Sequence, residues 1–311
     1  MKFKKPAFWD YKSPNFLSYV LLPLTIFILI NNFFINKSRP KERKIKSICV
    51  GNIYIGGTGK TPLTLEISKT LNDLNYKTVI VKKFYKNQID EQRLISKKTK
   101  LLCFKKRKEA LDDAIKKNID VAIFDDGLQD RSIKYDLSLV CFNNLKWVGN
   151  GLLIPAGPLR EKLSSILKYD GIFLSGNIEN TLKIKKDIKR INPNIKIFEA
   201  YYRPINLDKF NLKNKYLIFS GIGNPDSFRK MLFKYRFNII DELRFPDHHV
   251  YTKKDIYKIK LYAKKLGAKI LTTEKDHIKL DKNSSKDINF LKIDMIIKEK
   301  KKLINFIKSK I

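Results

Sequence analysis

The sequence predicts an α/β protein: a P-loop NTPase-like, doubly wound parallel sheet with a second, smaller α/β domain and an N-terminal hydrophobic helix. Three observations support this. Segments rich in β-formers alternate with helix-period segments along most of the 311 residues, as in parallel sheets. A glycine-rich turn at residues 55–62 joins a strand candidate to a helical pattern. A second strand candidate ends in two acids, Asp125 and Asp126.

The first element is an apolar run at residues 16–35. A bilayer-spanning helix needs about 20 such residues, and Pro23, Asn31 and Asn32 weaken this one. It could be a spanning anchor, a helix lying in the membrane interface or a soluble core helix. The positive-inside rule places the region after it in the cytoplasm, because six basic residues follow: Lys37, Arg39, Lys41, Arg43, Lys44 and Lys46.

The β-rich segments come next and set the sheet. The strand candidates are residues 47–53, 77–81, 99–103, 120–124 and 137–142, then 171–174, 195–201, 215–219, 237–242 and 268–273. The clearest helical patterns between them are residues 109–117 and 160–168. A boundary is expected near Arg203, because a fresh strand–turn–helix unit begins at Tyr216.

The composition indicates a folded protein that attracts anions. Its hydrophobic fraction is 43% and its formal net charge is +34, with the basic residues spread along the chain. Such a surplus favours nucleic acid, acidic headgroups or phosphorylated substrates. Three cysteines without metal spacing favour a reduced compartment over a disulfide scaffold.

The glycine-rich turn is the strongest chemical signal. A strand, a glycine-rich loop and Lys-Thr opening a helix form the arrangement that cradles nucleotide phosphates. The glycines let backbone N–H groups face an anion, the lysine reaches the β- and γ-phosphates, and the threonine hydroxyl can ligate Mg²⁺. Tyr54 departs from the strict pattern, which has glycine there. The loop residues are Gly56, Gly57, Thr58, Gly59, Lys60 and Thr61.

Three further motifs carry polar groups suited to phosphoryl transfer. Asp125 and Asp126 end an apolar strand, where a Walker-B acid holds Mg²⁺. A Gly/Pro-rich loop at residues 150–161 presents Arg160, which suits anion clamping. His248 lies beside Asp247 and His249, which favours acid–base work over metal ligation.

Six motifs occur together in one order: VGNIYIGGTGKTP, FDDGLQD, NGLLIPAGPLRE, FSGIGNPDSF, FPDHHVYTKKD and TTEKD. In that order and spacing the chain resembles the tetraacyldisaccharide 4'-kinases of lipid A biosynthesis, over roughly residues 45–280. The resemblance implies a membrane-associated, two-domain α/β kinase. It would transfer the ATP γ-phosphate to the 4'-hydroxyl of tetraacyldisaccharide 1-phosphate, a lipid A disaccharide precursor.

The resemblance also assigns roles to residues. Lys60 and Thr61 would bind phosphate and Mg²⁺, and Asp125 and Asp126 would serve the metal with Gln129 alongside. Arg160 would lie at the phosphates and Glu161 at the metal. His248 would form a base dyad with an acid that Asp90 matches best. Activity should then fall at acid pH, as the histidine is protonated.

Two departures from the family pattern stand out. The family has S-R-G-Y-G after its second strand, whereas this chain has Lys82-Lys83-Phe84-Tyr85-Lys86. Asp130 follows the DDGLQ motif where the family often has histidine.

The implied domains are a membrane-associating segment (1–36), a P-loop kinase domain (37–203) and a second α/β domain completing the active-site cleft (204–311).

The expected partners are the lipid acceptor and an anionic membrane surface, with no nucleic acid, and the expected location is the cytoplasmic face of the inner membrane. Two alternatives stay open. The net charge would also suit a nucleic-acid-dependent P-loop ATPase, with salt-sensitive binding. The altered segment at Lys82–Lys86 would suit a membrane-tethered nucleotide-binding protein without kinase activity.

Overall fold

A computed structural model describes residues 5–35, 45–85, 88–130, 132–176 and 181–311. The chain divides into two compact units. Unit 1 comprises Met1–Phe84, Lys98–Tyr201 and Met295–Ile311, and unit 2 comprises Tyr85–Lys97 and Tyr202–Asp294. The chain passes from unit 1 to unit 2 after Tyr201, close to the predicted boundary at residue 203. The sequence did not indicate the other passages between the units, by which residues 85–97 belong to unit 2 and residues 295–311 belong to unit 1.

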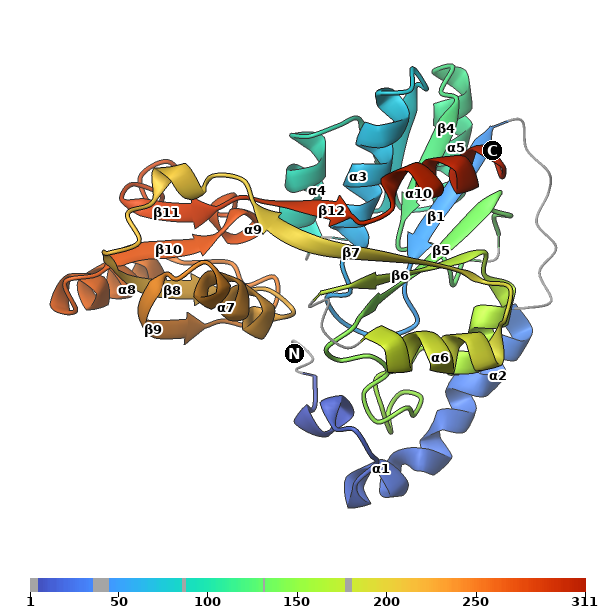
Figure 1. Cartoon of the computed structure of the whole chain (residues 1–311), viewed down its shortest axis with the longest axis horizontal. Helices are drawn as coiled ribbons and strands as arrows, with labels where there is room; N and C mark the ends of the chain where they lie inside the picture. The colour runs from blue at the N-terminus through green and yellow to red at the C-terminus, as the bar shows by residue number, and fades with distance from the viewer. Residues whose placement is uncertain (1–4, 36–44, 86–87, 131, 177–180) are drawn as a thin grey trace. The chain divides into compact units, whose positions relative to one another are not determined.

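Unit 1 is built on an eight-stranded sheet in the order β12-β7-β6-β5-β1-β4-β2-β3 (Figure 1). The pairs from β7 through to β3 are parallel. Because β1 pairs with both β4 and β5, the order reverses at the centre of the sheet, the usual place for a ligand. The strands are β1 (Lys46–Gly51), β2 (Thr78–Lys83), β3 (Leu101–Phe104), β4 (Val121–Asp125), β5 (Leu137–Asn143), β6 (Gly171–Ser175), β7 (Lys196–Pro204) and β12 (Ile293–Ile297).

Helices cover both faces of this sheet, so its central strands β1, β4 and β5 are buried along almost their whole length. On one face, α5 (Arg107–Lys116) and α6 (Thr181–Ile191) pack into a core with alternate residues of β1, β2, β4, β5 and β6. Helix α3 (Lys60–Asn72) packs on β1, β2 and β4. Near the C-terminus, Phe306 of α10 (Lys300–Lys308) contacts Phe198 of β7. The predicted doubly wound sheet is confirmed.

The N-terminal apolar run forms three short helical segments instead of one helix. These are α1 (Phe16–Leu21), a 3₁₀ turn (Leu22–Leu24) and α2 (Thr25–Ile35). Pro23 lies in the 3₁₀ turn and interrupts the α-helical hydrogen-bond pattern, because proline cannot donate a backbone hydrogen bond. Among the described residues, no helix combines the length and the apolar character needed to cross a membrane. The basic residues expected at 37–44 lie outside the described part of the chain.

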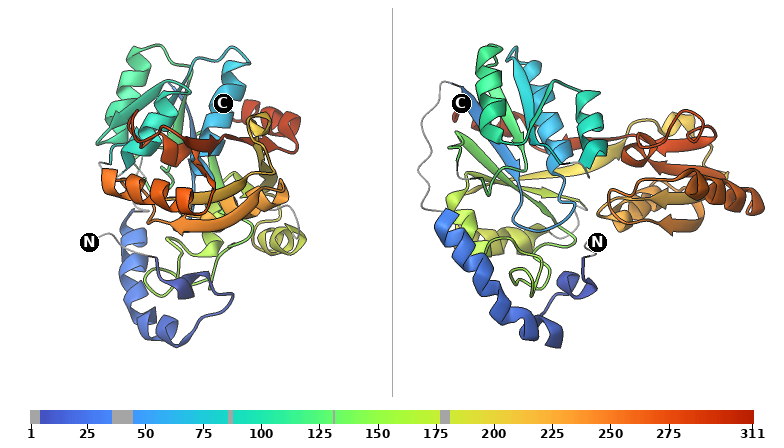
Figure 2. Two further views of the ribbon diagram at one scale, coloured as in Figure 1. Left: turned by 90° about the vertical axis from the view of Figure 1, so that its left-hand side faces the viewer. Right: turned by 180° about the vertical axis from the view of Figure 1, so that it is seen from behind.

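Unit 2 is built on a four-stranded parallel sheet in the order β11-β10-β8-β9. Its core lies on both faces, against α7 (Pro225–Lys234) and α8 (Lys253–Lys265). Figure 2 shows these helices and strands from two further sides. Two short helices, α4 (Ile89–Ser96) and α9 (Glu274–His277), also belong to unit 2. The strands are β8 (Lys215–Ser220), β9 (Asn238–Arg244), β10 (Lys269–Thr273) and β11 (Ile288–Leu291).

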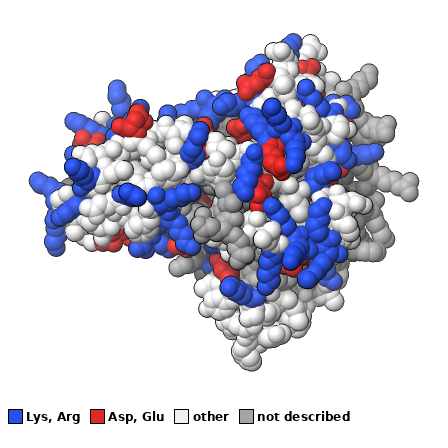
Figure 3. Space-filling model, viewed as in Figure 1, with Lys and Arg blue, Asp and Glu red and all other residues white. Residues whose placement is uncertain are grey.

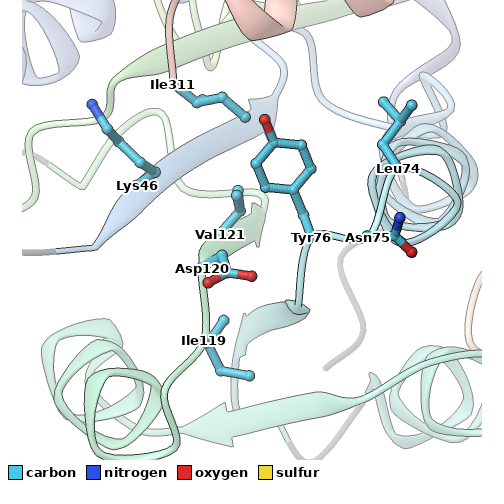
Figure 4. A pocket seen from close by; sticks show the side chains of 8 residues that line it. All are labelled: Lys46, Leu74, Asn75, Tyr76, Ile119, Asp120, Val121 and Ile311. Atoms are coloured by element: carbon cyan, nitrogen blue, oxygen red, sulfur yellow. The ribbon is translucent and has the colours of Figure 1, made fainter.

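A cavity of about 480 Å³ opens at the amino end of β1 and β4 in unit 1 (Figure 4). Lys46, Tyr76, Asp120 and the C-terminal Ile311 are among its lining residues. The phosphate-loop motif and the two strand-end acids follow the carboxyl ends of the same strands. The cavity is therefore at the opposite edge of the sheet, and the described residues that line it include none of the predicted site residues.

Candidate active site

The glycine-rich turn forms a phosphate loop at the carboxyl end of β1. Gly56 has φ +129° and Gly59 has φ +88°, backbone angles that favour glycine. Asn52 donates from Nδ2 to Thr58 Oγ1 at 3.0 Å, and Ser175 donates to the Thr58 carbonyl at 2.9 Å. Helix α3 then begins at Lys60, directly after Gly59. Its first N–H groups and the positive end of its dipole suit a phosphate.

Asp125 is the buried acid at the end of β4, and two donors share one of its oxygens. Thr61 Oγ1 lies 2.9 Å from Asp125 Oδ2, and Lys82 Nζ lies 2.7 Å from the same atom. The side chain of Asp125 is 0% exposed and that of Lys82 is 5% exposed. Asp125 Oδ1 is buried and has no hydrogen-bond partner among the described residues. An open carboxylate oxygen beside a threonine hydroxyl fits a Mg²⁺ ion or its bound water.

Asp126 lies next to Asp125, and its carboxylate pairs with Arg160 and Lys60. Arg160 approaches Asp126 Oδ1 at 3.2 Å, and Lys60 Nζ lies 3.9 Å from Oδ2. Burial alone would raise the pKa of Asp126. The positive charges of Lys60, Arg160, Lys82 and Arg107 outweigh burial and hold the pKa below its usual range. Asp126 is therefore ionised at neutral pH and keeps Lys60 and Arg160 at the loop.

Gln129 and Glu161 form a second layer behind these residues. Gln129 accepts from Arg160 at 3.2 Å and donates to Glu161 Oε1 at 2.9 Å. Tyr169 also donates to Glu161 at 2.9 Å. Within the described parts of the chain, no three His, Cys, Asp or Glu side chains gather as a metal site. Glu161 is linked to Asp126 through Gln129 and Arg160, and its role as a metal ligand stays a prediction.

The loop that presents Arg160 is held by the chain on both sides of it. Arg160 N donates to the Ile53 carbonyl at 2.7 Å, and Trp9 Nε1 of the N-terminal segment donates to the Pro155 carbonyl at 2.9 Å. A Cβ on Gly157 would lie 2.1 Å from Asn150 Oδ1, so only glycine fits there. Tyr54 is buried and its hydroxyl bonds to Asp10 and Lys5. The departure at Tyr54 therefore ties the phosphate loop to the N-terminal segment.

Unit 2 contains the predicted base pair. His248 Nδ1 lies 2.9 Å from Asp90 Oδ1 and 3.1 Å from Oδ2. Asp90 lies in the first turn of α4, where the helix dipole favours a negative charge. His248 lies in the loop after β9 and adopts a left-handed backbone, with φ 57°. The two residues are 158 positions apart, and the fold brings them into direct contact.

Lysines and acids surround this pair. Lys275 Nζ lies 3.0 Å from Glu91, 3.4 Å from Asp247 and 3.7 Å from Asp90. Lys279 Nζ lies 3.5 Å from Asp90 and 2.8 Å from the buried Asp276.

These contacts keep Asp90 ionised. Burial would raise its pKa, but the hydrogen bond with His248 and the charges of Lys275 and Lys279 lower the pKa below its usual value. In the neutral imidazole, Nδ1–H donates to this carboxylate and Nε2 keeps a lone pair that can accept a proton.

His249, the neighbouring histidine, has a packing role. Its ring stacks on Phe245 with centroids 4.8 Å apart and meets Tyr251 at 5.0 Å. Its Nε2 lies 3.2 Å from Asp255, the residue that forms the capping box of α8 with Thr252. His249 therefore fixes the loop that carries His248.

Sequence reasoning missed several residues at these sites. Lys82 stands out in the sequence only as a departure from a family pattern, although a lysine ending an apolar strand beside the strand of Asp125 could have suggested a buried ion pair. Lys275 and Lys279 are four positions apart in and after the TTEKD segment, a spacing that can bring two side chains together in helical backbone, and in the structure Lys275 lies in α9 and Lys279 in the turn that follows it. Arg107, which pairs with Asp130 at 3.1 Å, carried no sequence signal.

Comparison with known proteins gives a consistent result. The family model for tetraacyldisaccharide-1-P 4'-kinase matches residues 18–311. The tetraacyldisaccharide 4'-kinase of Pelagibacter ubique (strain HTCC1062) is 50% identical over 308 residues, which cover 98% of this chain and 97% of that protein. The enzyme of the same name from Rickettsia peacockii (strain Rustic) is 33% identical, with 90% and 91% covered.

Among solved structures, a kinase crystal structure shares the fold over nearly the whole chain. The crystal structure of LpxK from Aquifex aeolicus in complex with ATP has a TM-score of 0.69, at 22% sequence identity. The match covers 94% of this chain and 99% of that one.

Proposed function

The chain belongs to the tetraacyldisaccharide-1-P 4'-kinase family, and from this premise we propose how its residues perform the reaction. It is an ATP-dependent kinase that transfers the γ-phosphate to the 4'-hydroxyl of tetraacyldisaccharide 1-phosphate in lipid A biosynthesis. Unit 1 carries groups suited to a triphosphate, and unit 2 carries a base. The single observation that carries the residue assignments is the contact between Asp90 and His248.

Unit 1 binds the nucleotide in this proposal. The loop N–H groups and the α3 N-terminus hold the phosphates, while Lys60 and Arg160 offset the charge that spreads over the transferring phosphoryl group. Thr61 and Asp125 hold the metal, because Asp125 Oδ1 is buried with no partner in the described part of the chain, and Asp126 keeps both cations in place. When bound, Mg²⁺ neutralises phosphate charge and orients the triphosphate.

Unit 2 provides the base. Asp90 fixes the ring of His248 through Nδ1, so that Nε2 accepts the proton of the sugar hydroxyl as the oxygen attacks the γ-phosphorus in line. The proton moves to Nε2 as the bond between the sugar oxygen and the γ-phosphorus forms. The bond between the γ-phosphorus and the β–γ bridging oxygen breaks, and its electrons stay on the leaving ADP. The ionised Asp90 then stabilises the imidazolium that forms.

Substitution of Lys60 and His248 tests these roles. We expect His248→Ala to lower kcat by about 10²–10⁴-fold, the usual effect of losing a general base, with ATP affinity retained. Lys60→Ala should weaken binding of MgATP and also lower kcat. Steady-state kinetics with ATP and the lipid acceptor, together with calorimetry of ATP binding, separate the two effects.

The adjacent histidine gives a matched control. Because the His249 ring packs on Phe245 and Tyr251, His249→Ala should lower the melting temperature more than His248→Ala does. His248→Ala should lower kcat more than His249→Ala does. Wild-type turnover in His248→Ala, or equal kinetic losses in both variants, would contradict the assignment of the base.

We also propose that the protein binds an anionic membrane at the cytoplasmic face of the inner membrane, where its lipid acceptor would lie. The described N-terminal helices expose apolar side chains, with Phe16 79% and Phe27 68% exposed. Lysines and arginines spread over the visible face in Figure 3, in keeping with the net charge of +34. An apolar helical face with basic surroundings suits an interfacial position.

A further inference from the structure

Lys82 introduces a buried positive charge beside the proposed metal ligand. It is the penultimate residue of β2, and the register of the parallel sheet places Lys82 opposite Asp125 of β4. Its Nζ lies 2.7 Å from Asp125 Oδ2. An isolated buried carboxylate is unfavourable, and a buried ammonium at this distance is the partner that makes it tolerable.

The geometry gives the two oxygens of Asp125 different environments. Oδ2 accepts from both Lys82 and Thr61, whereas no described residue hydrogen-bonds to Oδ1. A divalent ion that approaches Oδ1 therefore meets a carboxylate already neutralised by a cation on its other oxygen. Like charges this close repel strongly in a buried site. The negative charge of a triphosphate would offset this repulsion.

We propose that Lys82 is a positioning residue that supplies a positive charge at the nucleotide site before any ligand binds. Because of this charge, the site binds Mg²⁺ together with the triphosphate and does not bind Mg²⁺ alone. Lys82 holds Asp125 in the metal-free protein through Oδ2 and leaves Oδ1 directed to the ion that arrives with ATP. This inference rests on the proposed function only in taking Asp125 as a metal residue.

The test compares the effect of magnesium on wild type and Lys82→Gln without nucleotide. Glutamine removes the charge but keeps a donor for Asp125 Oδ2, so the variant should fold. We expect MgCl₂ to raise the melting temperature of Lys82→Gln in a saturable way, because the ion replaces the missing counter-charge. The half-saturating Mg²⁺ concentration should be at least about tenfold lower than for wild type, tested against NaCl of equal ionic strength.

Three further variants sharpen the result. Lys82→Arg keeps the charge and should behave as wild type. Adding Asp125→Asn to Lys82→Gln should abolish the response to magnesium. Lys117→Gln is the matched control, because Lys117 forms a similarly short ion pair of 2.8 Å with Asp113 on the surface of α5. It should show no magnesium response.

Calorimetry adds a second measurement. The affinity for ATP without metal should fall about tenfold in Lys82→Gln, since a cation of the site is lost, while MgATP affinity changes less. Equal magnesium responses in wild type and Lys82→Gln would overturn the role of Lys82. Failure of the wild type to bind MgATP would instead overturn the proposed function.

Discussion

At the scale of single residues, Lys275 is the main source of positive charge around the base pair. Its ammonium contacts Glu91, Asp247 and Asp90. Burial would lower the pKa of Lys275, but these acids outweigh burial and raise the pKa above its usual value. Lys275 is therefore a permanent cation across the working pH range, and it helps to keep Asp90 ionised.

Removing this charge should move the acid limb of the pH–activity profile. The pKa of Asp90 is held low, so the ionised carboxylate persists until the pH falls through that lowered value. In Lys275→Met a positive charge beside the base pair is lost, so the coupled Asp90–His248 pair takes up the proton that inactivates the base at a higher pH. We expect the acid limb of kcat to move to higher pH, and a move of one pH unit would make kcat about tenfold lower at a fixed pH on that limb.

The control for this change is Lys258→Met on the exposed face of α8. It removes the same charge from unit 2 without a contact to Asp90 among those described, so its pH profile should match that of wild type. Kinetics over a pH series measure both variants. An unshifted acid limb in Lys275→Met would show that proton uptake by the Asp90–His248 pair does not depend on this lysine.

Some of the site residues could be predicted from the sequence, and others could not. The phosphate loop, Asp125, Asp126 and Arg160 could be predicted because each follows a strand or a turn-rich loop, and the carboxyl ends of parallel strands share one edge. The contact of Asp90 with His248 came only from a resemblance, since no local pattern links residues so far apart. Lys82 could not be assigned a partner, because a one-residue change in register would have turned its side chain to the other face.

At the scale of secondary-structure elements, Glu199 joins three parts of unit 1. Lying on β7, it accepts from Thr181 of α6 at 2.6 Å and pairs with Lys185 at 3.0 Å. It also pairs at 2.9 Å with Lys298, which follows β12. Burial would raise the pKa of Glu199, but these donors lower it from the usual 4.5 to about 2. This carboxylate therefore helps to hold residues 295–311 in unit 1.

Glu199→Gln should therefore destabilise the protein in a pH-dependent way. The folded pKa is lowered, so the ionised carboxylate stabilises the fold above pH 4.5 and this contribution is lost as the pH falls towards 2. Because the group is partly solvated, we expect a loss of only about 1 kcal/mol at neutral pH. Urea unfolding at several pH values should show the difference from wild type shrinking below about pH 4.

Glu66→Gln is the matched control, because Glu66 of α3 has one described ion pair, 2.9 Å from Lys300. Its loss should cost less and vary less with pH. A difference between wild type and Glu199→Gln that stays constant down to pH 3 would contradict the role of the Glu199 cluster.

Elements with strong patterns were predicted well, and those with mixed patterns were not. The ten predicted strands correspond to β1–β10 with ends shifted by up to three residues, because apolar runs identify buried strands directly. The strands β11 and β12 were missed, since polar residues interrupt their short apolar segments. The predicted helix at residues 160–168 is a 3₁₀ helix over Leu163–Lys168. It begins three residues later than predicted, because the backbone of Arg160 hydrogen-bonds to Ile53 in the loop and is not helical.

At the scale of the whole molecule, the N-terminal segment combines two roles. Its inner side supports the active-site loop, since Asn32 Nδ2 donates to the Arg160 carbonyl at 3.0 Å and Asn150 donates to Ser18 at 3.0 Å. Its outer side is apolar and exposed. Deleting the segment would therefore disturb the loop of Arg160 as well as any membrane contact, and substitutions on the outer side alone separate the two.

We expect Phe16→Ser with Phe27→Ser to weaken binding to anionic phospholipid vesicles by well over tenfold, up to about a thousandfold, because each aromatic side chain contributes up to about 2 kcal/mol when it is buried at an apolar boundary. The matched control is Leu167→Ser with Leu182→Ser, which removes two apolar side chains of similar exposure, 61% and 72%, elsewhere in unit 1. Vesicle co-sedimentation measures binding, and turnover of a detergent-dispersed acceptor should stay near wild type. Equal losses in both pairs would point to general hydrophobicity, whereas unchanged binding in the phenylalanine pair would contradict an interfacial N-terminal segment.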